Sequence, residues 1–182
     1  MITALAVASW TSACAPNAAE EADRARHLAR TGDLSGAAMA WSRALEQEDS
    51  DPARLELART LVQLARPEDA AREYQLLLRH RPDYAALWLE FGRFSESSRH
   101  DLRGAELAYR RAAELAPDNA EAHLHWGLVL VQLSDFEGAK AELQAALSLG
   151  APDAPWRETA QNAIVEAHLR QREAERRQAE GR

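Results

Sequence analysis

The sequence contains one cysteine, Cys14, so it cannot form a disulfide bond within the chain. Pairs of Cys and His at the spacings of structural zinc sites are absent as well. His123 and His125 stand two residues apart on a predicted helix, where they point to different faces and cannot share a metal ion. Side-chain packing must therefore hold the fold together, and we expect no metal site.

Motifs of catalytic sites are missing too, because the sequence has no Gly-rich phosphate loop, no nucleophile elbow and no HExxH. We therefore predict that the protein is not an enzyme and binds no cofactor.

An excess of basic charge is also missing, since the formal net charge is -7 at pH 7. This charge argues against non-specific binding to nucleic acid or to an anionic membrane surface, which would need a basic face.

Residues that favour β-strands are few, and Ala, Leu, Glu and Arg dominate the composition. This composition favours an all-α fold. A chain of 182 residues is long enough for one domain with a sizeable core.

The N-terminal segment from Met1 to Ala13 is mostly apolar and uncharged, but it is too short to span a bilayer. Small residues stand directly before Cys14. This pattern resembles a bacterial lipoprotein signal, although no Lys or Arg precedes it and Thr11 stands where such signals usually carry Leu. The resemblance implies a signal segment at 1–14, a lipid on Cys14 and a short tether at 15–20. The alternative is an apolar N-terminus with an incidental thiol.

A pattern of small and bulky residues recurs along the rest of the chain. The small residue is Ala37, Ala70, Ala105 and Ala139, at intervals of 33, 35 and 34 residues. Four positions later come the bulky residues Trp41, Tyr74, Tyr109 and Leu143. The clearest copy runs from Ala120 to Asp153 and predicts two amphipathic helices separated by a tight turn and ended by Gly150 and Pro152. Repeats of this period indicate stacked helical hairpins.

The arrangement resembles the tetratricopeptide repeat (TPR) family, whose units are helical hairpins of about 34 residues. The resemblance implies an all-α, right-handed α-α superhelix of about four hairpins. The array at 18–153 would contain the units 18–50, 51–84, 85–119 and 120–153. After it, Trp156, Ala160, Ala163, Ile164 and Ala167 form one apolar face. They predict a capping helix at 154–169, followed by a solvated charged tail at 170–182 that forms a fraying helical end.

Two units depart from the repeated pattern. In the first, Arg24 occupies an apolar position, so this unit is the least regular. The third is one residue longer than the 34-residue period, and we expect the surplus in the turn from Ser97 to Asp101, because both flanking helices keep their register.

The resemblance also implies a groove lined by the first helix of each unit. Its apolar row would be Leu55, Leu89 and Leu124, and its second row Arg26, Arg59 and Arg93, ending in Leu128, with Arg30 beside them. Such a groove suits an extended or helical peptide with apolar and acidic residues, because a guanidinium pairs with a carboxylate through two hydrogen bonds. The alternative is that these arginines pair internally with Glu56, Glu90 or other neighbours.

These features predict a scaffold for protein–protein interaction, tethered to a bacterial envelope membrane only through Cys14 and facing the periplasm. Its layout resembles small TPR lipoproteins that assist secretin or type IV pilus assembly. Alternative roles are an adaptor for outer-membrane β-barrel assembly or peptidoglycan enzymes, and a structural protein that self-associates. The location would be cytoplasmic if the N-terminus is not a signal. The oligomeric state is left open.

Overall fold

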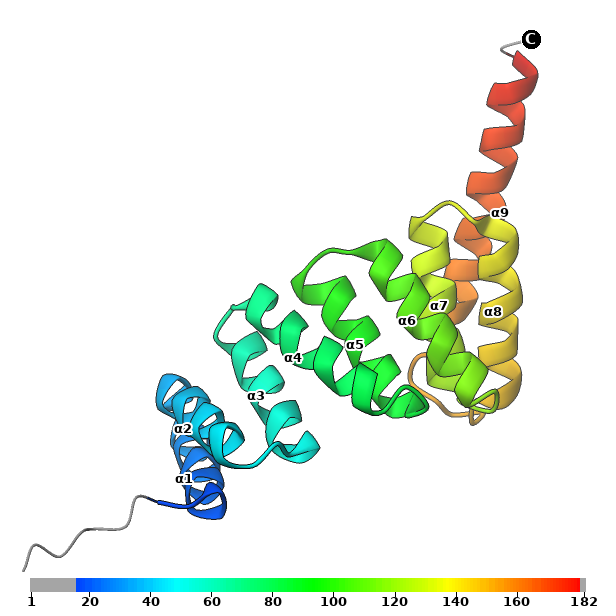
Figure 1. The fold of residues 1–182 in the computed structure, drawn as a ribbon. Helices are drawn as coiled ribbons and strands as arrows, with labels where there is room; N and C mark the ends of the chain where they lie inside the picture. The colour runs from blue at the N-terminus through cyan, green and yellow to red at the C-terminus, as the bar shows by residue number, and fades with distance from the viewer. Residues whose placement is uncertain (1–15, 181–182) are drawn as a thin grey trace, which may run out of the picture.

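The computed structural model describes residues 16–180, and within that range the chain forms nine helices and no strand. The first helices of four hairpins are α1 (Ala18–Thr31), α3 (Asp51–Gln63), α5 (Ala85–Ser98) and α7 (Ala120–Gln132). The second helices are α2 (Leu34–Gln47), α4 (Pro67–His80), α6 (Leu102–Leu115) and α8 (Phe136–Leu149). The hairpins stack in chain order, with α1 at one end and α9 (Arg157–Glu180) at the other (Figure 1). The predicted all-α repeat array is therefore confirmed.

The candidate lipidation site Cys14 and the whole signal-like segment at 1–14 lie outside the described residues. The first helices begin at the residues where the predicted units begin. Within residues 16–180, no helix is both long enough and apolar enough to cross a membrane.

One backbone conformation recurs in the turn inside every hairpin. A residue with positive φ follows the first helix in each unit: Gly32 (89°), Ala65 (53°), His100 (53°) and Ser134 (65°). These residues stand five positions before the recurring alanines, so the turn and the helix that follows keep a fixed register. Such a left-handed residue ends a helix by letting the next backbone N–H groups reach the last free carbonyls.

The third hairpin has a wider turn than the others. In the other three units, the N–H group that closes the turn donates to a carbonyl five residues earlier, as Asp135 does to Leu130 at 2.9 Å. In the third unit, Asp101 donates to Ser95, six residues earlier, at 2.9 Å. The surplus residue of this unit therefore lies between Ser95 and Asp101, in the stretch where the sequence predicts it.

The two helices of each hairpin approach closely where a small residue of the first meets a bulky residue of the second. The small residues are Ala25, Ala58, Gly92 and Gly127. A Cβ atom on Gly92 would lie 2.5 Å from the ring of Tyr109, which is itself fully buried. Tyr109 and its counterparts Trp41, Tyr74 and Leu143 are all core residues. The recurring bulky position in the sequence is thus the interior of each hairpin.

The last helix, α9, closes the C-terminal end of the array. Its buried face holds Ala160, Ala163 and Ala167, and this face packs in one core cluster with residues of α7 and α8. The helix does not end with its capping segment, because α9 is a single helix that continues through Glu180 beyond the array (Figure 1). Its later residues are strong helix formers and include the i,i+4 pair Arg170–Glu166 at 2.6 Å.

Candidate functional site

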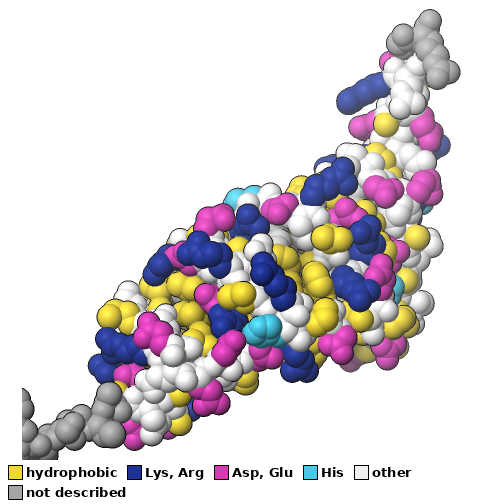
Figure 2. All heavy atoms as spheres, viewed as in Figure 1, with side chains coloured by type: hydrophobic (Ala, Val, Ile, Leu, Met, Phe, Trp, Pro, Cys, Tyr) yellow, Lys and Arg dark blue, Asp and Glu magenta, His cyan; other side chains and the backbone are white. Residues whose placement is uncertain are grey.

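We call the surface that the first helices are predicted to line the inner groove. Position nine of each unit lies on it and carries Arg26, Arg59, Arg93 and Leu128. Position six carries Asp23, Glu56, Glu90 and His125. Acidic and basic residues therefore alternate along three units, and the fourth replaces both charges. On the face of the molecule that Figure 2 shows, arginine and acidic side chains lie close together, with apolar surface between them.

Arg59 is held by acidic residues of two units. Its Nε and Nη2 donate to the two carboxylate oxygens of Glu90 on the next unit, at 2.8 and 2.7 Å, and its Nη1 donates to Glu56 at 2.8 Å. The hydroxyl of buried Tyr74 also donates to Glu90, at 2.9 Å. Burial raises the pKa of Glu90, but the hydrogen bonds from Arg59 and Tyr74 outweigh it and hold the pKa below its ordinary value. This guanidinium is already engaged within the protein.

Arg93 also bridges two units, because it pairs with Glu121 at the start of α7. The position-six residue of that unit, His125, stacks on the ring of Tyr109 with centroids 5.2 Å apart. Burial, together with the positive charge of Arg93, lowers the pKa of His125 below 6.5. The hydroxyl of Tyr109 donates to Glu96 at 2.9 Å. Internal pairing, the alternative that the sequence left open, therefore describes both Arg59 and Arg93.

Arg26 differs from these two arginines. Its Nη2 donates to Asp23 of its own helix, and its guanidinium lies over the Trp41 ring, 5.8 Å from the centroid. Glu56 occupies the place in the next unit that Glu90 occupies for Arg59, but it is hydrogen-bonded to Arg59. No ion pair between Arg26 and the second unit is found among the described residues. The N-terminal end of the inner groove is thus less completely paired than its middle.

A pocket of about 600 Å³ lies at this N-terminal end. Its lining residues come from the first two hairpins and are Asp23, Arg26, Ala29, Arg30, Trp41 and Glu56. The structure therefore brings together two of the predicted groove residues, Arg26 and Arg30. Ala29 and the largely buried Trp41 line this pocket together with two arginines, as binding of a carboxylate next to an apolar side chain would require.

The predicted apolar row of the groove is wrong for two of its three residues. Leu89 is only 7% exposed and Leu124 only 4% exposed, and both belong to core clusters. Leu55 and Leu128 are partly buried against the core. Side chains at position five point between packed helices, so they stabilise the array and leave little surface for a peptide. Whether the arginine row binds a peptide stays a prediction.

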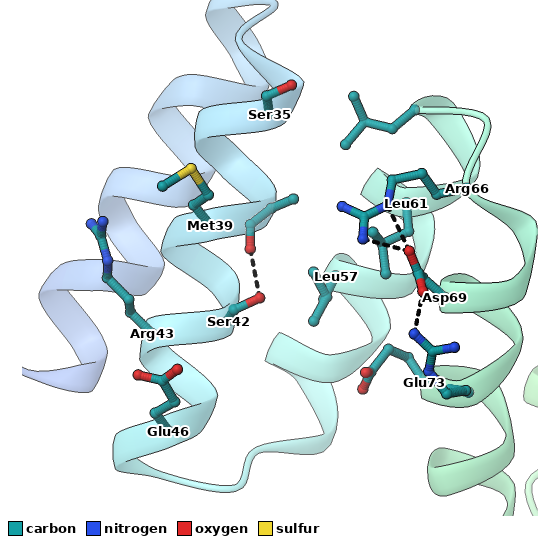
Figure 3. Close-up of a pocket in the computed structure, with 13 residues that line it drawn as sticks. Ser35, Met39, Ser42, Arg43, Glu46, Leu57, Leu61, Arg66, Asp69 and Glu73 are labelled. Atoms are coloured by element: carbon teal, nitrogen blue, oxygen red, sulfur yellow. Dashed lines mark hydrogen bonds and ion pairs between the residues drawn. The ribbon is translucent and has the colours of Figure 1, made fainter.

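A second pocket, of about 550 Å³, lies on the opposite side of the first two hairpins, between α2 and α4. We call it the outer notch. Ser42 of α2, Leu57 and Leu61 of α3 and Asp69 of α4 border the same space (Figure 3). The sequence did not predict it. The only signal was a change at the start of the second helix, where three units have Asp followed by Gly three residues later and the second has Arg66 and Asp69 instead.

This exchange creates a charge cluster at the rim of the outer notch. In the other units, the aspartate carboxylate accepts the backbone N–H of the glycine, as Asp33 does from Gly36 at 2.8 Å. In the second unit, Arg66 Nε instead donates to Asp69 at 2.6 Å, and Arg72 pairs with the same carboxylate. Both arginines remain exposed.

Groups of three or more His, Cys, Asp or Glu that could hold a metal ion are absent from residues 16–180. His123 and His125 face different partners, because His123 bonds Glu142 at 2.7 Å and His125 stacks on Tyr109. These two histidines cannot act together on one ligand.

No family model matches the sequence, and no curated protein matches it either. Solved structures do match the fold. A crystal structure of MamA aligns with a TM-score of 0.73 and 20% identity, covering 84% of this chain and 81% of that chain. YrrB, described as a TPR protein with an unusual peptide-binding site, aligns at 0.70 with 18% identity, covering 85% and 78%.

TTC0263, a thermophilic TPR protein of Thermus thermophilus, aligns with a TM-score of 0.55 and 24% identity, covering 85% of this chain and 82% of that chain. The low identities restrict the comparison to the fold. Four stacked hairpins, their recurring turns and these alignments together show that the chain has the tetratricopeptide-repeat fold.

Proposed function

We propose that the protein is a non-enzymatic adaptor that binds a segment of a partner protein at the N-terminal end of its inner groove. A lipid on Cys14 would tether it to a bacterial envelope membrane, where it would assist assembly of a secretin or type IV pilus machine. The binding role is supported by the fold and the pocket. The tether is supported by the lipoprotein-like sequence before Cys14, and the assembly role by the layout of the chain.

The observation that carries the binding role is the pocket around Arg26, Arg30 and Trp41. Among residues 16–180, the one ion pair of Arg26 is with Asp23, an exposed neighbour on the same helix. Exposed ion pairs of this kind contribute only about 0 to 1 kcal/mol, so a ligand carboxylate can replace Asp23 at little cost. The peptide-binding site described for YrrB supports the same class of ligand here.

The chemistry of the pocket defines the partner segment. Two guanidinium groups recognise one or two carboxylates, and the surface between Ala29 and Trp41 accepts an apolar side chain. We therefore expect a segment with an acidic residue next to an apolar one. The charged pairs further along the groove would orient the segment but contribute less to affinity, because Arg59 and Arg93 already have internal partners.

Selection from a random peptide library on the full chain tests the binding role. We expect enriched peptides to share an acidic residue beside an apolar one, and to bind an Arg26→Ala/Arg30→Ala variant at least tenfold more weakly. Arg24→Ala is the matched control, because Arg24 is exposed on the same helix but does not line the pocket. Enrichment of basic peptides, or equal binding to the wild-type protein and the double variant, would contradict the proposal.

Incorporation of labelled palmitate in a bacterial host tests the tether. The full chain should take up label and fractionate with membranes, and Cys14→Ser should do neither. Equal labelling of the two proteins would end the idea of a lipid anchor while leaving the binding role untouched. Genes for pilus or secretin components beside the coding gene would support the assembly role.

A further inference from the structure

The pocket at the N-terminal end of the inner groove offers an acidic group as well as basic ones. Arg26 and Arg30 line it from α1, and Glu56 lines it from α3 of the next hairpin. Asp23, also on α1, is the residue that a ligand carboxylate would replace at Arg26. A volume of about 600 Å³ holds a ligand with several functional groups. Glu56 therefore lies within reach of a ligand that is bound by the two arginines.

Glu56 is held in a fixed position. Arg59 Nη1 donates to Glu56 Oε1 at 2.8 Å, and the Nε and Nη2 atoms of the same guanidinium donate to Glu90 of the third hairpin. Because Arg59 is itself anchored on the third hairpin, it keeps the Glu56 carboxylate in the lining of the pocket.

One oxygen of this carboxylate remains available to a ligand. Glu56 Oε2 accepts no hydrogen bond from any residue between 16 and 180, and the side chain is 46% exposed. An ionised carboxylate accepts several hydrogen bonds through its two oxygens, and those from cationic donors are the strongest. Glu56 can therefore accept a guanidinium or ammonium group of a ligand while it keeps its bond to Arg59.

The arginines of the pocket are less constrained than Glu56. Arg26 has its one ion pair with Asp23, and Arg30 forms none within the described part of the chain. A ligand carboxylate is thus met by side chains that can adjust to it, whereas the fixed charge in the pocket is negative. A second ligand carboxylate near Glu56 would be repelled, and a basic group there would be attracted.

The equivalent positions further along the groove do not offer this combination. Both oxygens of Glu90 already accept hydrogen bonds, from Arg59 and from the Tyr74 hydroxyl. In the fourth unit this position is His125. Along the described groove, a partly open carboxylate beside unengaged arginines occurs at the first junction, so a segment that needs both has a single register.

We propose that the partner segment carries both charges and that Glu56 binds its basic residue. This inference rests on the proposed binding role, in which Arg26 and Arg30 bind the acidic residue, and it adds the basic residue to the segment. Because different hairpins bind the two charges, the segment has one direction, with its acidic residue over α1 and its basic residue over α3. The pocket then selects against segments that carry acidic residues alone.

Parallel selections from one random peptide library on the full chain test the proposal. The proteins are the wild type, Glu56→Gln and Glu46→Gln. Glu56→Gln removes the negative charge but keeps an oxygen that accepts from Arg59. Glu46→Gln is the matched control, because Glu46 is an exposed glutamate of the first hairpin that does not line this pocket. Circular dichroism of each variant verifies that it is folded.

Peptides selected on the wild type and on Glu46→Gln should carry a Lys or Arg on one constant side of the acidic and apolar residues. Peptides selected on Glu56→Gln should keep the acidic and apolar residues without this preference. Titration calorimetry then measures one wild-type-selected peptide against the same peptide with its basic residue replaced by Ala. The replacement should weaken binding to the wild type about fivefold, as for an exposed ion pair, and leave binding to Glu56→Gln unchanged.

Two results would overturn the inference while leaving the binding role intact. One is a set of wild-type-selected peptides with acidic and apolar residues but no shared basic residue. The other is a basic preference that persists in Glu56→Gln, which would assign it to another carboxylate such as Asp23. Selected peptides without the acidic residue would instead contradict the proposed function itself, so the two failures are distinguishable.

Discussion

The N-terminal end and the middle of the inner groove carry the same arginine but use it differently. Arg59 donates two hydrogen bonds to the carboxylate of Glu90 on the next unit, and the Tyr74 hydroxyl donates to the same carboxylate. Arg26, at the equivalent position, bonds only Asp23 of its own helix. The middle of the groove therefore joins two hairpins, whereas the N-terminal end keeps a guanidinium and a pocket for a ligand.

This difference shows that a repeated residue need not have a repeated role. The role depends on whether the following unit offers a free carboxylate at the right position. Glu90 accepts hydrogen bonds from Arg59 of the preceding unit. Glu56, at the equivalent position, accepts a hydrogen bond from Arg59 of its own helix instead of from Arg26. In the fourth unit, His125 stands at the position of this carboxylate, and Arg93 forms an ion pair with Glu121. The acidic residues of the following unit thus determine whether an arginine is paired within the protein.

The largest effect should follow removal of the carboxylate in the middle of the groove. Glu90→Ala would leave the buried Tyr74 hydroxyl without its acceptor and would remove two hydrogen bonds that Arg59 donates. We therefore expect a loss of about 1 to 3 kcal/mol in the free energy of unfolding. Asp23→Ala at the N-terminal end should cost only about 0 to 1 kcal/mol. Urea unfolding followed by circular dichroism measures the free energy of unfolding of both variants. Equal losses would contradict the difference between the middle and the N-terminal end of the groove.

The next effect separates affinity from stability. Arg26→Ala should weaken binding of a selected acidic peptide at least tenfold, or about 1.4 kcal/mol, and leave stability unchanged within about 0.5 kcal/mol. Arg59→Ala should show the reverse pattern, with a clear loss of stability and a smaller change in affinity. Titration calorimetry and thermal unfolding of the two variants provide the measurement. Identical profiles would mean that the two arginines share one role.

The smallest effect is a pH dependence confined to the junction of the third and fourth units. Burial and Arg93 lower the pKa of His125, while Glu96 and Glu121 raise it, and the net result lies below the unfolded value of 6.5. The folded state then binds fewer protons, so this stabilisation is complete above pH 6.5 and is lost as the pH falls through the folded pKa.

We expect this loss to be the smallest of the three effects, because it comes from a single titrating group. Unfolding of the wild-type protein and of His125→Gln between about pH 7.5 and pH 5 measures it, since the variant lacks the titrating group. The wild-type protein should lose more stability than the variant over this interval. A steeper loss in the variant would contradict the assigned direction of the pKa shift.

The sequence predicted the hairpins because local spacing determines them. The small residue Ala105 and the bulky Tyr109 stand one helical turn apart, and that spacing alone places them on the packed face. The placement of Arg26 and Arg59 on one face was implied by the resemblance to the TPR family. The pairing of Arg59 with Glu90 was not implied by it, because it depends on how one hairpin rests against the next.

The burial of Leu89 and the outer notch were missed for related reasons. A leucine at a regular helical spacing suits a groove and a core equally well, and only the packing of neighbouring helices decides between them. The notch arises from the short side chains of Ser35 and Ser42, which have no motif of their own.

A crystal structure of the protein with a selected acidic peptide tests the central claim most directly. The account predicts a peptide carboxylate within hydrogen-bonding distance of Arg26 or Arg30, an apolar peptide side chain against Trp41, and the Arg59–Glu90 pair unbroken. A peptide carboxylate on Arg59 with Glu90 displaced, or a peptide bound only outside the inner groove, would contradict it.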